Sequence, residues 1–251
     1  MIDIHSHILP CLDDGARSMQ ESLSMLKMAL ATGTTDIIAT PHSNSKFVFD
    51  AEVTEQRIAE LQAASGNMPR IHYGCELHLT MEGIEDALRL PEKYTIGHRS
   101  YVLVEFSNVL VPKTTGEIFD QMLARGIRPI VAHPERNPLL RERMPELEMW
   151  VSQGCCLQVT AQSLLGRFGK SADAASHDLM ERGLVHFLAS DAHDLRHRPP
   201  ILSGVGRYVE KAFDRETADR LLIGNPQAVL DGTPVATGYP LVRKKFWSLL
   251  W

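Results

Sequence analysis

Residues 1–15 of the chain are MIDIHSHILPCLDDG, a short apolar strand that runs into two histidines and then into a loop with two aspartates. Ile2 and Ile4 alternate with polar residues, which is typical of a β-strand. Residues two apart in extended backbone project to the same side, so His5 and His7 present their imidazoles together. This stretch predicts a strand whose end carries metal-binding groups.

Short β-branched segments recur along the chain and are separated by amphipathic stretches of helical length. We predict strands at 2–5, 36–40, 71–77, 101–106, 129–133, 155–160 and 185–190. Helices are expected at 18–31, 52–64, 115–125, 144–153 and 172–182, followed by two more at 205–212 and 215–223. Alternation of strands and helices predicts a single α/β domain with a parallel sheet and helices outside it.

Six of the seven predicted strands end in, or run into, residues that can bind a metal. With one aspartate of the first loop, the candidates are His5, His7, Asp14, His42, Glu76, Glu105, His133, Asp191 and His193. Any one of these residues is as readily explained as a hydrogen-bonded structural residue or a helix cap as it is as a metal ligand. The evidence for a metal site is that the same residue types recur at six of the seven strand ends. The strands of an open sheet cannot all end at one point, whereas those of a barrel meet at its C-terminal mouth. The set therefore favours a closed barrel.

The candidate ligands are imidazoles and carboxylates without a thiolate. This mixture suits Mn, Fe or Zn at a catalytic site better than a structural zinc site. Nine ligands are too many for one ion, whereas three ions that share a bridging carboxylate would keep open positions for water and substrate. Strand 155–160 is the exception, since it ends in Gln158 and Thr160 without a ligand.

Composition excludes several classes of protein. The chain has 251 residues, of which 44% are hydrophobic and 23% charged, as in ordinary globular proteins and unlike disordered ones. Its net charge of −5 gives no electrostatic reason to bind nucleic acid. No apolar run is long enough to span a membrane, and no signal peptide or disulfide framework is evident. We expect a cytoplasmic protein.

Six stretches carry a resemblance to a known superfamily: MIDIHSHILPCLDDG, IIATPH, YGCELHL, VLVEFS, PIVAHPERN and LASDAHDLRHRPP. In order and spacing they resemble the PHP (polymerase and histidinol phosphatase) superfamily of metal-dependent phosphoesterases. Within it, they are most similar to bacterial protein-tyrosine phosphatases of capsule and exopolysaccharide clusters. The resemblance extends from Met1 to Pro200 and implies a distorted (β/α)7 barrel with three divalent ions. Manganese is expected, with iron, zinc or magnesium as alternatives.

The resemblance also implies individual roles. It assigns the first ion to His5, His7, Glu76 and Asp191, the second to Glu76, Glu105 and His133, and the third to Asp14, His42 and His193. Arg136 and Arg198 match the substrate-orienting arginines of the family. His78 stands where the family pattern has a tyrosine or a similar residue, and it is not expected to be a ligand.

The implied activity is hydrolysis of phosphotyrosine by in-line attack of a hydroxide that bridges two metal ions. Three divalent ions would outweigh the four candidate carboxylates, so an acidic chain would still present a positive pocket to phosphate. The implied partner is a phosphotyrosine protein, namely a membrane-associated bacterial tyrosine kinase of polysaccharide biosynthesis.

Three alternatives stay open. Cys11 and Arg17 fit the C-x5-R pattern of phosphatases with a cysteine nucleophile, although two aspartates in the loop would repel phosphate. A barrel with the same metals could hydrolyse a small phosphomonoester such as histidinol phosphate. A metal-binding protein without enzymatic activity is the third alternative, which the presence of both arginines disfavours.

We expect two parts in the chain, a metallophosphatase barrel at 1–238 and a basic and aromatic tail at 239–251. The end of the tail, RKKFWSLLW, combines three cations with an apolar run. It is too short to span a bilayer but could contact an anionic membrane surface. Packing of these aromatic residues on the barrel or on another subunit is the favoured alternative.

Overall fold

The computed structural model describes residues 1–66, 68–238 and 240–244, and every strand pair in it is parallel. The strands are β1 Ile2–Ser6, β2 Asp36–Ala39, β3 His42–Ser43, β4 Arg70–Tyr73, β5 Glu76–His78, β6 Tyr101–Glu105, β7 Arg128–Ala132, β8 Cys156–Thr160 and β9 Phe187–Ala189. They form a three-stranded sheet of order β1-β2-β4 and a six-stranded sheet of order β3-β5-β6-β7-β8-β9.

The two sheets close into one barrel. At one seam β1 lies beside β9, where the amide of Asp191 donates to the oxygen of His5 (2.9 Å) and the amide of His7 donates to the oxygen of Ala192 (2.8 Å). At the other seam β2 leads into β3 and β4 leads into β5, so the chain passes from one sheet to the other. With each of these pairs counted as one strand, seven strands follow one another around the barrel in sequence order. The predicted (β/α)7 barrel is confirmed, and the two interrupted strands are its distortion.

The prediction of a single strand at 71–77 was wrong, because Gly74 and Cys75 interrupt this segment and divide it into β4 and β5. A Cβ atom on Gly74 would lie 2.8 Å from Cγ2 of Ile38 and 3.2 Å from the oxygen of Ala39. Only glycine permits this close approach of the crossing chain to β2. The break transfers the chain to the sheet of β6, and the new strand begins at Glu76.

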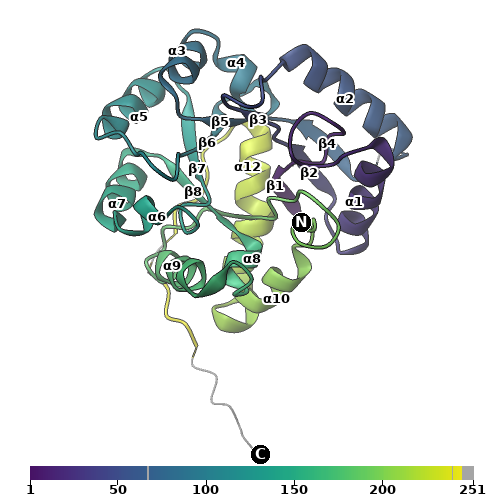
Figure 1. Ribbon diagram of the computed structural model, residues 1–251. Helices are drawn as coiled ribbons and strands as arrows, with labels where there is room; N and C mark the ends of the chain where they lie inside the picture. The colour runs from purple at the N-terminus through teal and green to yellow at the C-terminus, as the bar shows by residue number, and fades with distance from the viewer. Residues whose placement is uncertain (67, 239, 245–251) are drawn as a thin grey trace, which may run out of the picture.

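Helices surround the barrel as a ring, except for α12, which lies across the centre (Figure 1). They are α1 Met19–Ala31, α2 Ala51–Ala64, α3 Met81–Arg89, α4 Pro91–Tyr94, η1 Ile96–His98, α5 Thr115–Ala124, α6 Pro138–Arg141, α7 Met144–Gln153, α8 Ala161–Leu164, α9 Gly169–Glu181, α10 Ser203–Ala212, α11 Arg215–Asp219, η2 Arg220–Gly224 and α12 Asn225–Asp231. The helix predicted at 215–223 is α11 followed by the π-helical η2, and the other predicted helices are present with bounds shifted by a few residues.

The barrel interior is apolar below the strand ends. Ile4, Leu103, Ile130 and Phe187 from four strands form one buried cluster, and Val229 of α12 belongs to it. Figure 1 shows α12 across the centre of the ring. The side-chain amide of Asn225, at the start of α12, donates to the oxygen of His186 just before β9 (3.0 Å). Helix α12 therefore covers the N-terminal end of the barrel and leaves the C-terminal mouth for chemistry.

The start of the predicted tail lies against the body of the molecule. The amide of Leu241 donates to the oxygen of Glu181 (2.7 Å), and that of Lys244 donates to the oxygen of Ala212 (2.8 Å). Residues 239 and 245–251, which include most of the segment considered for membrane contact, lie outside the described residues. No helix in the described part of the chain has both the length and the apolar character needed to cross a bilayer.

We predict that His186 makes the fold sensitive to acid. Its buried Nδ1 accepts a hydrogen bond from the amide of Leu157 (3.2 Å), and burial together with the charge of Arg220 lowers its pKa to about 4. Between this value and the unfolded pKa of about 6.5, the unfolded chain binds a proton that the folded chain does not. Stability should therefore fall as the pH falls through this window, with roughly 3 kcal/mol lost at pH 4.

The variant His186→Asn keeps an acceptor for Leu157 but cannot titrate. When the pH is lowered from 7 to 4, the unfolding free energy of the parent chain should fall by roughly 3 kcal/mol more than that of the variant. Urea denaturation at both pH values measures this difference. The control His197→Asn removes an imidazole whose side chain is 89% exposed, and should follow the parent. Identical pH dependence in His186→Asn and the parent would contradict the prediction.

Candidate metal centre

All nine predicted ligands meet at the C-terminal mouth of the barrel. Four groups of side chains in the described residues could hold a metal ion, and together they contain these nine residues and no others: His5, His7, Asp14, His42, Glu76, Glu105, His133, Asp191 and His193. They come from the ends of β1 and β6, the starts of β3 and β5, the loop after β1 and the segments after β7 and β9. The topology thus brings together side chains that are up to 188 positions apart in the sequence.

The innermost group combines His5 and His7 with two buried carboxylates. Nε2 of His5 lies 3.2 Å from Nε2 of His7, and 3.3 Å from both Oε1 of Glu76 and Oδ1 of Asp191. Nε2 of His7 lies 3.3 Å from Oε2 of Glu76 and 3.4 Å from Oδ1 of Asp191. Ligand atoms about 2.1 Å from one tetrahedral ion lie about 3.4 Å apart. These spacings therefore suit a single ion at the centre of the group.

Glu76 connects this group to its neighbours. Its Oε1 also lies 2.9 Å from Nε2 of His133, and its Oε2 lies 3.0 Å from Nδ1 of His42. The carboxylate is buried and contacts four imidazoles that belong to different candidate groups. It is therefore placed to be shared between ions.

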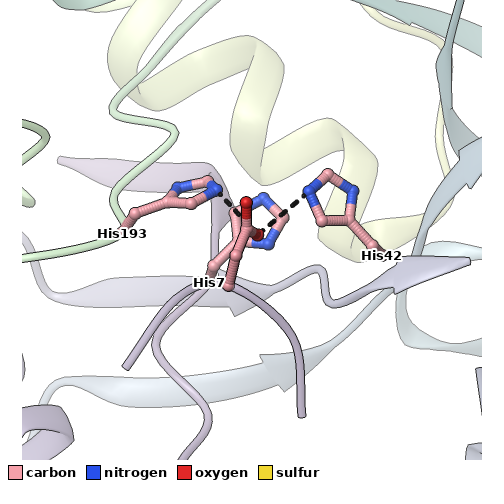
Figure 2. Close-up of side chains that lie close together, drawn as sticks. His7, His42 and His193 are labelled. Carbon is pink, nitrogen blue, oxygen red and sulfur yellow. Dashed lines mark ion pairs between the residues drawn. The ribbon is translucent and has the colours of Figure 1, made fainter. Parts of the chain in front are cut away.

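A third group lies toward solvent. Figure 2 shows the imidazoles of His7, His42 and His193 converging from three segments of the chain. Oδ1 of Asp14 lies 3.3 Å from Nε2 of His42 and 3.4 Å from Nε2 of His193. The Asp14 side chain is 49% exposed, the largest value among the nine, so substrate and water can reach the centre from this side.

Glu105 and His133 border a cavity of about 100 Å³ that Arg136 and Asn108 also line. Oε1 of Glu105 lies 3.8 Å from Nε2 of His133. The Glu105 carboxylate also accepts from Nδ1 of His78 at 3.3 Å, so His78 contacts a ligand and is in none of the metal groups. This small polar cavity beside an arginine has room for a few water molecules or an anion.

Three imidazoles are oriented by acceptors behind them. Nδ1 of His5 donates to Oε1 of Gln158 (2.9 Å), Nδ1 of His7 to Oδ2 of Asp13 (2.7 Å), and Nδ1 of His193 to the backbone oxygen of Asp191 (3.0 Å). In each case the proton on Nδ1 leaves the Nε2 lone pair directed at the centre. That Asp13 and Gln158 orient these histidines was not predicted from the sequence. A buried glutamine within an apolar strand was the one available signal.

Local backbone geometry also serves the centre. His133 and Asp191 follow their strands with left-handed φ values of 34° and 50°, which are costly for residues other than glycine. The strain turns both side chains from the strand direction toward the mouth. Gly15 lets the first loop pass over His7, because a Cβ atom there would lie 2.1 Å from the His7 oxygen.

The donor atoms fit a bound cation. Four buried ligand atoms make no well-oriented hydrogen bond in the described structure, namely Nδ1 of His42, Oε2 of Glu76, Oδ1 of Asp191 and Nε2 of His193, although the first two lie only 3.0 Å apart. Unpaired buried polar atoms are costly, and native structures contain few of them. Their convergence on one region is explained if cations are their partners.

Electrostatics of the side chains alone lead to the same conclusion. Burial opposes the charged form of His42, but Asp14 and Glu76 outweigh burial and raise its pKa to about 10. Burial would raise the pKa of Glu76, yet the histidines, His5 first, hold it well below its usual range. The Glu76 carboxylate thus remains ionised and attracts positive charge, which protons or metal ions supply.

The two predicted arginines lie at the edge of the centre. Nη1 of Arg136, after β7, and Nη2 of Arg198, after β9, both donate to Oδ2 of Asp191, while Oδ1 faces the imidazoles. The guanidinium of Arg136 also lies 4.6 Å from the ring centroid of Phe168. Both cations are therefore held where an anion beside the metals would meet them.

The cysteine alternative finds little support in the first loop. The exposed Cys11 thiol donates to the backbone oxygen of Arg17 (3.1 Å). Neither residue belongs to any metal group. The loop instead directs Asp14 toward His42 and His193, and Asp13 accepts from Nδ1 of His7 and from the amides of Gly15 (2.9 Å) and His42 (3.1 Å).

Comparison with known proteins agrees with this site. Residues 1–231 match the family described as capsular polysaccharide synthesis, CpsB/CapC. The tyrosine-protein phosphatase YwqE of Bacillus subtilis is 37% identical over 221 residues, with 86% of each chain covered. The tyrosine-protein phosphatase CpsB of Streptococcus agalactiae is 31% identical over 247 residues, with 92% of this chain and 98% of that protein covered.

Solved structures agree as well. A structure described with YwqE of Bacillus subtilis and CpsB of Streptococcus pneumoniae as metal-dependent tyrosine phosphatases superposes with a TM-score of 0.86 at 33% identity, covering 98% of this chain and all of that one. The histidinol phosphate phosphatase of Lactococcus lactis has a TM-score of 0.56 at 13% identity, covering 97% of this chain and 98% of that one, and shares the fold. The chain therefore belongs to the CpsB/CapC family and is a metal-dependent tyrosine-protein phosphatase.

Proposed function

We propose that the chain removes phosphate from tyrosine side chains of a phosphoprotein with three divalent ions, manganese foremost, held by the nine residues at the barrel mouth. The observation that carries this proposal is the convergence of nine candidate ligands, imidazoles and carboxylates, four of whose buried ligand atoms make no well-oriented hydrogen bond. The proposed sets are His5, His7, Glu76 and Asp191 for one ion, Glu76, Glu105 and His133 for a second, and Asp14, His42 and His193 for a third.

Divalent ions bound there would lower the pKa of water toward neutrality and offset charge on the phosphoryl oxygens. The chain's own residues would position the ligands and bind the phosphate. Gln158 and Asp13 hold the imidazoles of His5 and His7, so the ligand atoms need no rearrangement.

Arg136 and Arg198 are proposed to bind the phosphoryl group. Each guanidinium rests on Oδ2 of Asp191, beside the group of His5 and His7, and each retains N–H groups that can turn to phosphate oxygens. Their planar donors suit an anion with three oxygens better than an ammonium would. A tyrosyl leaving group has a conjugate acid of pKa about 10, so its departure needs only weak assistance.

The proposed physiological substrate is a membrane-associated bacterial tyrosine kinase of polysaccharide biosynthesis. The family is one of capsular polysaccharide synthesis, and the matched relatives are tyrosine-protein phosphatases, so a phosphoprotein of that process is the substrate class. Contact of the C-terminal tail with the membrane is a further proposal. It is tested by liposome co-sedimentation of the chain shortened to end at Gly238.

Metal removal separates this mechanism from a cysteine mechanism. Chelation should abolish hydrolysis of a phosphotyrosyl peptide, and add-back of Mn²⁺ should restore it with three ions per chain by elemental analysis. Cys11→Ser should retain most of the activity, because the Cys11 thiol belongs to none of the metal groups. Full activity after chelation, or its loss in Cys11→Ser with metals retained, would overturn the proposal.

A further inference from the structure

We propose that Phe47 is a specificity-determining residue whose ring contacts the tyrosyl ring of the substrate; this inference rests on the proposed function. The Phe47 ring lies parallel to the imidazole of His42, at 10° and with a centroid separation of 5.9 Å. His42 belongs to the solvent-facing group with Asp14. The Phe47 ring therefore borders the metal centre on its most exposed side.

The loop between β3 and α2 holds Phe47 in place from both ends. The side-chain oxygen of Asn44 accepts from the amides of Lys46 and Phe47, both at 2.9 Å, and the amide of Asn44 donates to the oxygen of Phe47 (3.0 Å). Further along, the buried Phe49 ring packs against Tyr73 and Tyr94 at 6.1 and 5.8 Å. A ring held in this way can contact a ligand at little entropic cost.

Core packing does not account for Phe47. Phe49 anchors the loop to the core, whereas Phe47 stays half-buried and Val48 between them is 91% exposed. The Lys46 ammonium lies 4.6 Å from the Phe47 centroid, which adds positive charge to the same surface. An apolar ring with a cation at the rim of a phosphatase site suits a phosphorylated aromatic group.

The distances suit this role. In phosphotyrosine the ring begins one oxygen atom away from phosphorus, and aromatic rings make contact at centroid separations of about 4.5 to 7 Å. The Phe47 ring lies 5.9 Å from the His42 ring, which is within this range. A tyrosyl ring bound next to His42 would therefore be close enough to contact Phe47. The loop itself borders a groove of about 590 Å³, whose lining includes Phe47 and, across from the loop, Thr80, and this groove provides space for the attached polypeptide.

The test compares inhibitors that differ only in the ring. In the metal-loaded enzyme, Phe47→Ala should weaken inhibition by benzylphosphonate about tenfold and inhibition by methylphosphonate less than twofold. The KM for a phosphotyrosyl peptide should rise by a similar factor with kcat nearly unchanged. Phe47→Tyr should behave as the parent, and Val48→Ala, the matched control in the same loop, should change neither inhibitor.

Measurement of metal content distinguishes substrate contact from a purely structural role of Phe47. If Phe47 only supports His42, Phe47→Ala should lose metal or weaken both phosphonates equally, and either result would overturn the proposal. Unchanged benzylphosphonate binding would also overturn it. The phosphonate comparison does not require turnover, so failure of the parent enzyme to hydrolyse phosphotyrosine would refute the proposed function separately.

Discussion

Glu76→Gln is expected to lower kcat/KM for a phosphotyrosyl peptide by about 10³-fold or more, equivalent to roughly 4 kcal/mol of transition-state stabilisation. The Glu76 carboxylate contacts four imidazoles, two through each oxygen, at 2.9 to 3.3 Å. A glutamine keeps the shape but replaces one ligand oxygen by an NH₂ group, which cannot bind a cation. If the carboxylate is shared between ions as proposed, one substitution should disturb more than one ion.

The measurement is metal content per chain beside steady-state kinetics, with circular dichroism to verify the fold. We expect loss of at least one ion per chain. Glu60→Gln on α2, at an exposed carboxylate paired with Arg57, is the matched control and should retain both metal and activity. A Glu76→Gln enzyme with full metal content and activity within tenfold of the parent would show that Glu76 is not a bridging ligand.

The convergence of the candidate ligands could be predicted from the sequence because the barrel imposes a simple rule. Parallel strands end at one mouth, so ligand-type residues at strand ends must converge there. His133 and Asp191 illustrate this rule, since His133 is the last residue of one predicted apolar strand, Asp191 directly follows another, and both lie at the centre. The prediction needed only strand periodicity and residue type, both of which are local properties of a sequence.

Residues that act through other residues were not predictable in this way. Gln158 was noted as the end of a strand without a ligand, yet it orients His5 across 153 positions. Asp13 stood beside the predicted ligand Asp14, and nothing local distinguishes an aspartate that holds His7 from one that faces the metals. Such roles depend on which acceptor the fold places behind an imidazole, which is a property of the tertiary structure.

The interruption at Gly74 has the same origin. The segment 71–77 has the apolar pattern of one strand, and no local signal marks where the chain must leave one sheet for the other. The break is set by the approach of this segment to Ile38 and Ala39, which are more than thirty positions away. Its functional result is local, however, because the second strand begins at Glu76 and directs that carboxylate into the mouth.

Arg136→Lys and Arg198→Lys are each expected to lower kcat/KM by about 10²-fold, because a hydrogen bond between charged groups contributes roughly 1.5 to 3 kcal/mol. Lysine keeps the charge and loses the planar pair of donors, so inorganic phosphate should bind more weakly by a similar factor. Both arginines share Oδ2 of Asp191, and the effects of the two substitutions should therefore be less than additive.

The arginines have a competing explanation, because they also neutralise Asp191, a proposed ligand. Burial would raise the pKa of Asp191, and the charges of His5, Arg136 and Arg198 instead hold it well below its usual range. If that were their whole role, the lysine variants would retain the charge and leave phosphate binding unchanged, or would alter metal content. Weaker phosphate inhibition at full metal content, with activity of Arg136→Ala partly restored by added guanidinium, assigns them to the substrate. In that case Asp191 has two functions, with Oδ1 directed at the metals and Oδ2 holding the guanidinium groups until phosphate displaces it.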